Sequence, residues 1–149
     1  MNAAISPAAV VVRRTIAAKP EILFDAWLDP EALAAWMRPG TVPRTVATVD
    51  ARVGGRYEIV MHLESGEIVP HTGVYLTIDR PRRLEFTWLS HYTGKRDTLV
   101  TVDFVPRGDH TEIVVTHAQL PESDRADHDK GWTTAIEKLA QKYGKDPVR

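Results

Sequence analysis

Histidines are the side chains of this sequence best suited to acid–base chemistry. There are six of them, and imidazole is the only side chain whose ordinary pKa lies between pH 5 and 8. His117 alternates in phase with Ile113 and Val115 and should share their inward direction. His128 falls on one helical stripe with Trp132 and should face the same interior. Two inward histidines could orient a polar ligand group or act as a general base, and each could equally be a hydrogen-bonded structural residue.

His62 and His71 flank a predicted turn, and the faces they occupy depend on its length. A two-residue turn within "ESGE" places both imidazoles on the face opposite to Met61, the solvated side of the sheet. A three-residue loop reverses this arrangement. Both alternatives stay open at the level of sequence.

The sequence contains no motif for cysteine, serine, metal or nucleotide-cofactor chemistry. The chain has no cysteine, which excludes disulfides, thiolate zinc sites and cysteine nucleophiles. The spacings of its histidines match no metal-ligand pattern. No serine lies in a G-x-S-x-G turn, and no glycine-rich loop of the Walker or dinucleotide type is present. We therefore expect no catalytic residue, no metal and no cofactor.

Aromatic residues give a stronger signal than the histidines. Tryptophan and tyrosine need partners for their polar atoms when buried, and aliphatic side chains would fill a solid core more simply. Their convergence predicts an incompletely filled space that suits an apolar or aromatic ligand. The expected apolar contacts are Trp27, Met61, Phe86, Trp88, Trp132 and Ile136, and the expected orienting groups are Tyr75, His117 and His128.

Gly131 is unusual because it lies inside the last helical segment, directly before Trp132. Glycine in a helix interior costs about 1 kcal/mol relative to alanine. One interpretation is that the missing side chain lets the helix approach the sheet, so that Trp132 points inward and lines the bottom of a cavity. The other is ordinary helix–sheet packing, in which glycine is needed only to avoid a clash with the backbone. Both place Gly131 at a close contact, so Gly131→Val should overpack the interface.

Composition sets the broad class of the protein. The 149 residues carry a formal net charge of −1, with 43% hydrophobic and 26% charged residues, as expected for one globular domain over residues 1–149. No basic patch suggests nucleic acid as a partner. No apolar run approaches the ~20 residues of a membrane span, and the first residues do not resemble a secretory signal. We expect a cytoplasmic protein.

The order of predicted elements indicates an α+β fold. A β-branched segment at 9–16 is followed by two short helices that begin at Pro20 and Pro30. Alternating segments fill 45–117, and a long amphipathic helix with Ser123 as its N-cap follows. A long antiparallel sheet curls, and a curled sheet that grips one helix leaves space between them unless large side chains fill it.

Four segments carry a family resemblance: "FDAWLDPEALAAWM", "VGGRYEIVM", "TGVYLTIDRPRRLEFTW" and "THAQLPESDRADHDKGWTTAIEKLA". In that order they resemble the activator of 90-kDa heat-shock protein ATPase homologue-like family, within the START-like, polyketide-cyclase and Bet v1-like (SRPBCC) superfamily. The resemblance covers Val11 to Tyr143. It implies the helix-grip fold, in which a curved antiparallel sheet of six to seven strands surrounds a long C-terminal helix, with two short helices after the first strand.

The expected function is non-catalytic binding of a small hydrophobic ligand between the sheet and the C-terminal helix. An alternative is a cyclase or hydrolase that uses His117 or His128 as its acid–base group. A third is a chaperone-associated protein-binding module, as the family name implies. A homodimer formed through the first strand or an exposed sheet edge is also compatible with the sequence.

Overall fold

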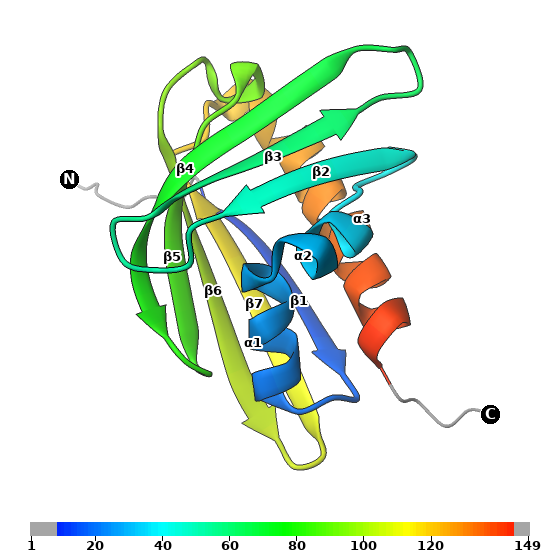
Figure 1. Cartoon of the computed structure of the whole chain (residues 1–149), viewed down its shortest axis with the longest axis vertical. Helices are drawn as coiled ribbons and strands as arrows, with labels where there is room; N and C mark the ends of the chain where they lie inside the picture. The colour runs from blue at the N-terminus through cyan, green and yellow to red at the C-terminus, as the bar shows by residue number, and fades with distance from the viewer. Residues whose placement is uncertain (1–8, 145–149) are drawn as a thin grey trace.

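Seven strands form one antiparallel sheet in the computed structural model, which describes residues 9–144 (Figure 1). Their spatial order is β1-β7-β6-β5-β4-β3-β2, so the first and second strands are the two edges. The strands are β1 (Val10–Ile16), β2 (Arg44–Val49), β3 (Arg56–His62), β4 (Ile68–Asp79), β5 (Arg83–Trp88), β6 (Thr98–Arg107) and β7 (His110–Ala118).

Three α-helices accompany the sheet in the described residues: α1 (Pro20–Leu28), α2 (Pro30–Trp36) and α3 (Arg125–Tyr143). Both short helices begin at a proline, as predicted, and the Asp29 carboxylate accepts the N–H of Glu31 at 3.2 Å. The predicted N-cap of the long helix is wrong. Ser123 lies in the short 3-10 helix η2 (Glu122–Asp124), and Asp124 precedes α3 without a side-chain cap.

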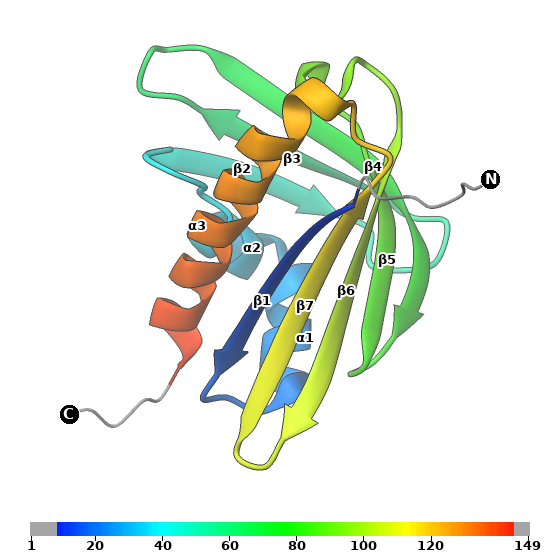
Figure 2. The ribbon, with the colours of Figure 1, turned by 180° about the vertical axis from the view of Figure 1, so that it is seen from behind.

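The helices cover the concave side of the curled sheet. Figure 1 shows α1 and α2 in front of the sheet, and Figure 2 shows α3 running beside the edge strand β1. This arrangement confirms the predicted helix-grip fold. None of the helices in the described part of the chain is long and apolar enough to cross a membrane.

Helix α1 fills one half of the concave side with large side chains. The ring of Phe24 lies 5.1 Å from that of Phe104 on β6, and Trp27 packs edge-on against Trp36 at 4.7 Å. The indole N–H of Trp36 donates to the Ala26 carbonyl at 3.0 Å. This half of the interior is therefore densely packed with aromatic side chains.

Strand β4 changes partners along its length, and the sheet bends there. Its first residues pair with β3 and its last residues with β5, with a register shift between Tyr75 and Thr77. A Cβ at Gly73 would lie 1.9 Å from the Thr87 carbonyl oxygen. The Tyr57 hydroxyl donates to that same oxygen at 2.5 Å. Only glycine permits this close crossing of strands.

The β3–β4 hairpin has the longer of the two turns considered from the sequence. Ile59 pairs with His71, and a hydrogen bond of 2.9 Å from Leu63 N to Glu67 O encloses a three-residue loop. His71 therefore faces inward with Ile59, and His62 faces the opposite side of the sheet. The two-residue alternative, with both imidazoles on the solvated face, is wrong because Gly66 takes a left-handed conformation that makes room for the extra residue.

Candidate functional site

A cavity of about 390 Å³ lies under the N-terminal half of α3. The β3–β4 hairpin and the end of β5 form its sheet side, and the loop between α2 and β2 forms a third wall. Most of the wall is apolar, through Met37, Val42, Met61, Leu63, Val69, Trp88 and Trp132. The polar groups that line it are His71, Tyr92, Asp124, Asp127, His128, Lys130 and Thr134.

The structure brings some of the predicted ligand contacts to this cavity. Met61, Trp88, His128 and Trp132 all line it. The rings of Trp88 and Trp132 lie 5.2 Å apart, so they form one continuous aromatic surface. This surface joins the sheet side of the cavity to the helix side.

The other predicted contacts do not line it. Trp27, Tyr75 and Phe86 surround a separate void of about 10 Å³, which is at the lower limit for a single water molecule. They pack against one another and against α1 and α2, and they are core residues. Ile136 and His117 are also buried, at 1% and 0% exposure, and lie outside the cavity wall.

His117 is held in a chain of buried hydrogen bonds. The indole N–H of Trp132 donates to its Nδ1 at 3.0 Å, so that nitrogen carries no proton. Its Nε2–H then donates to the Thr98 hydroxyl at 2.7 Å, and this hydroxyl donates to the Trp88 carbonyl at 2.7 Å. Burial lowers the pKa of His117 to about 3, which keeps the ring neutral.

His71 is one of the two imidazoles, with His62, whose sheet face depends on the turn length, and it belongs to the cavity wall. Its side chain is 5% exposed, and its ring lies 5.0 Å from that of Trp88. Nδ1 lies 3.3 Å from the Ile59 carbonyl oxygen. Burial lowers the pKa of His71 to about 4. The turn length was the signal that would have placed it.

His128 lines the opposite side of the cavity, on the second turn of α3. Its Nδ1 donates to the Asp124 carbonyl at 2.8 Å, which fixes the ring against the start of the helix. Its ring meets that of His117 edge to face at 5.1 Å. The half-buried imidazole is therefore backed by the hydrogen-bonded histidine of the core.

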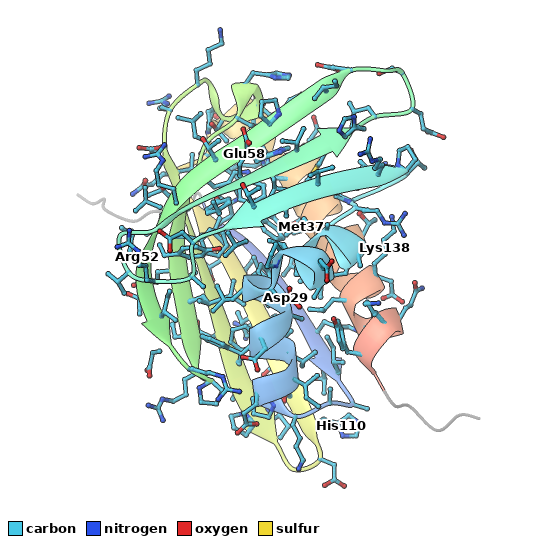
Figure 3. The ribbon with its side chains drawn as sticks, in the orientation of Figure 1. Asp29, Met37, Arg52, Glu58, His110 and Lys138 are labelled. Carbon is cyan, nitrogen blue, oxygen red and sulfur yellow. The ribbon has the colours of Figure 1, made fainter. Side chains whose placement is uncertain are left out.

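The 38–43 loop is the wall that sequence reasoning missed, because it has no periodic pattern. The Lys138 ammonium donates to the carbonyls of Arg38 and Gly40, the latter at 2.8 Å. The Thr134 hydroxyl accepts the N–H of Gly40 at 2.7 Å. Figure 3 shows Met37 and Lys138 where α2 approaches α3. The loop is thus tied to α3 across the cavity.

Gly131 lines the cavity but is not at a close contact, so that prediction is wrong. A Cβ built on it would meet only the Cβ of Pro39, at an ordinary distance of 3.7 Å. The helix does not approach the sheet at this point because the cavity lies between them. A side chain at position 131 would extend over this space and toward the 38–43 loop.

Charged groups are confined to the rim of the site. Asp127 and Lys130 come from the start of α3, and Asp124 directly precedes it, where carboxylates also favour the helix dipole. Within residues 9–144, no three histidine, aspartate or glutamate side chains are grouped so as to hold a metal ion. The arrangement suits a ligand with an apolar body and a few polar groups.

Comparison with other proteins agrees with this architecture. The family model for activator of Hsp90 ATPase homolog 1-like protein matches residues 17–144. Protein CV1439 from Chromobacterium violaceum is 27% identical, with 94% of this chain and 99% of that chain covered and a TM-score of 0.83. CalU16 from Micromonospora echinospora is 25% identical, with 89% and 74% covered and a TM-score of 0.69.

A more distant likeness is one of fold alone. PFC0360w, an HSP90 activator from Plasmodium falciparum, is 23% identical, with 89% of this chain and 88% of that chain covered and a TM-score of 0.63. Among curated proteins none matches the sequence. The helix-grip fold and the match to the family model over most of its length show that this chain belongs to the activator of Hsp90 ATPase homolog 1-like family.

Proposed function

We propose that the protein binds a small, mostly apolar ligand in the cavity under α3 and does not transform it chemically. The observation that carries this proposal is an apolar space of about 390 Å³ with two indole rings in its wall. Small-molecule sites typically occupy about 300–1,000 Å³ and combine an apolar lining with a few polar groups. An aromatic ligand would find matching surface on Trp88 and Trp132.

The hydrogen bonding of the histidines supports binding over catalysis. Both ring nitrogens of His117 are engaged within the core, so this residue is not free to exchange protons with a ligand. Of the two histidines considered for acid–base chemistry, only His128 lines the cavity. The cyclase or hydrolase alternative would have to rest on that residue. We also expect a cytoplasmic location, in keeping with the absence of cysteine.

The test is a titration monitored by tryptophan fluorescence. Trp88 and Trp132 line the cavity, so a bound ligand changes the surroundings of both indoles. We expect at least one class in a panel of aromatic polyketides, steroids and fatty acids to give a saturable change. No response across the panel would contradict the proposal.

A matched pair of variants locates the binding site. Gly131→Phe places a ring over the cavity, whereas Thr133→Phe places the same ring on the exposed face of the same helix. We expect the first to abolish binding of the responding compound and the second to leave its Kd unchanged. Equal Kd values for both variants would place the ligand elsewhere.

A further inference from the structure

His71 and His128 both line the cavity, and both bond to a backbone carbonyl through the same ring nitrogen, Nδ1. Nδ1 of His71 bonds to the Ile59 carbonyl, and Nδ1 of His128 bonds to the Asp124 carbonyl. A carbonyl oxygen only accepts hydrogen bonds, so each Nδ1 must carry the proton. A neutral imidazole has a single N–H, and its Nε2 is then an acceptor. These bonds use Nδ1 of each ring and leave Nε2 for a ligand.

The two acceptors lie on opposite sides of the same space. His71 comes from β4 on the sheet side and His128 from α3 on the helix side, and both line the cavity. The ring of His71 contacts that of Trp88 at 5.0 Å, and Trp88 contacts Trp132 at 5.2 Å. Trp132 lies one helical turn beyond His128. The aromatic surface therefore extends from one acceptor toward the other.

The charges on the rim disfavour an anionic ligand. Asp124 and Asp127 both line the cavity, and Lys130 is the one lysine or arginine among its described lining residues. Burial lowers the pKa of His71 to about 4, so at neutral pH this imidazole offers a lone pair and no positive charge. A carboxylate brought against it would have to lose its hydration without an ionic partner.

We propose that the cavity selects an aromatic ligand carrying hydroxyl groups that donate hydrogen bonds to Nε2 of His71 and Nε2 of His128. This inference rests on the proposed function and names the ligand class for the same site. The ligand is a phenol or a hydroxylated polycyclic compound, and a fatty acid or other carboxylate is excluded. Tyr92 and Lys130 at the rim are left for any further polar group of the ligand.

Three probes of similar shape separate this inference from the proposed function. Naphthalene-2,7-diol has two donors, 2,7-dimethoxynaphthalene has none, and 2-naphthoate carries a charge. In calorimetric titrations at pH 8, we expect the diol to bind most tightly of the three. Each hydrogen bond should raise its affinity by about threefold to tenfold. Equal Kd values for the diol and the ether would overturn the inference alone. No binding by any of the three would overturn both proposals.

Single substitutions test whether the imidazoles cause the preference. His71→Phe and His128→Phe keep a ring but remove the acceptor. Each should therefore weaken binding of the diol by about threefold to tenfold and leave the Kd of the ether unchanged. His71→Gln restores an acceptor and should recover part of the affinity. His62→Phe is the control, since His62 is on the same hairpin and faces away from the cavity. A diol preference that survives in both phenylalanine variants would show discrimination by size and overturn the inference.

Nitrogen NMR of the wild-type protein gives a readout that does not depend on the folding of variants. We expect His71 to be a neutral Nδ1–H tautomer at pH 8. The Nε2 resonances of His71 and His128 should move on addition of the diol and not of the ether. A protonated Nε2 on either ring in the ligand-free protein would contradict the assignment of acceptors.

Discussion

The indole N–H of Trp132, on α3, donates a hydrogen bond of 3.0 Å to Nδ1 of His117, on β7. Both side chains are buried, and the chain continues through the Thr98 hydroxyl to the backbone of Trp88. In this series of hydrogen bonds Nδ1 of His117 accepts from the indole, so the proton of the neutral ring is on Nε2. The long helix is thus joined to the sheet by a specific polar contact within an otherwise apolar interface.

Removing either member of this pair should destabilise the protein. Trp132→Phe leaves Nδ1 of His117 without its donor, and His117→Phe leaves the indole N–H without its acceptor. We expect each orphaned group to lower the free energy of unfolding by about 1–3 kcal/mol in urea titrations. The double variant should lose less than the sum of the two single losses. Additive losses would show that the two groups are not coupled.

Stability should fall as the pH is lowered from about 6.5. The pKa of His71 is about 4 and that of His117 about 3 when folded, both below the ordinary value of 6.5. As the pH drops, the unfolded chain therefore binds protons before the folded one, and the loss ends only below the folded values. Each histidine contributes up to about 1.4 kcal/mol per pH unit in this interval. Urea titrations at a series of pH values measure the slope.

Variants identify the source of that slope. His71→Phe and His117→Phe should each reduce it, because a phenylalanine takes up no proton in either state. A slope that is the same in both variants as in the wild-type protein would assign the acid sensitivity to other groups.

Gly131→Ala should stabilise the protein. The added Cβ meets only Pro39 at 3.7 Å, and the substitution removes a glycine from a helix interior. We expect a gain of about 1 kcal/mol in the free energy of unfolding, with a higher Tm. A loss of stability would mean that α3 lies closer to its neighbours here than the structure shows.

Gly73→Ala should have the opposite effect. Its Cβ would lie 1.9 Å from the Thr87 carbonyl and 2.6 Å from the Tyr57 ring, and the carbonyl belongs to backbone that cannot move aside independently. We expect a loss of at least about 3 kcal/mol, measured by urea unfolding or as loss of soluble protein. Near-wild-type stability would show that the strands can separate at this bend at little cost.

Thr134→Val and Lys138→Met should loosen the 38–43 loop. The valine removes the acceptor for the Gly40 N–H, and the methionine removes the ammonium that binds the Arg38 and Gly40 carbonyls. We expect faster hydrogen exchange at the Gly40 amide in both variants. The exchange of the β6 and β7 amides should stay as in the wild-type protein. Unchanged exchange at Gly40 would show that other contacts hold the loop.

The element order and the inward direction of most side chains could be predicted from the sequence because both depend on local rules. Prolines at 20 and 30 mark helix starts, and the alternation around Ile113 predicts that His117 is buried, as it is. Register is different, since it depends on one residue more or less in a turn. For that reason His71 could not be assigned to the cavity from the sequence.

The sequence also could not separate cavity wall from core. Trp27, Phe86 and Trp88 all occupy inward positions, and period-two or helical patterns treat them alike. Trp27 and Phe86 are core residues and Trp88 lines the cavity, because α1 fills only one half of the concave side. Which half is filled depends on where the helix packs on the sheet. The same limit explains Gly131, whose neighbour across the gap is the 38–43 loop and not the sheet.

The hydrogen bond between Trp132 and His117 also has a consequence for ligand binding. It anchors one indole of the aromatic surface, and the Thr98 hydroxyl anchors the main chain that carries the other. Their spacing is consequently established in advance, and few rotamers remain to be frozen on association. Binding of a ligand would then resemble docking onto a preformed aromatic surface.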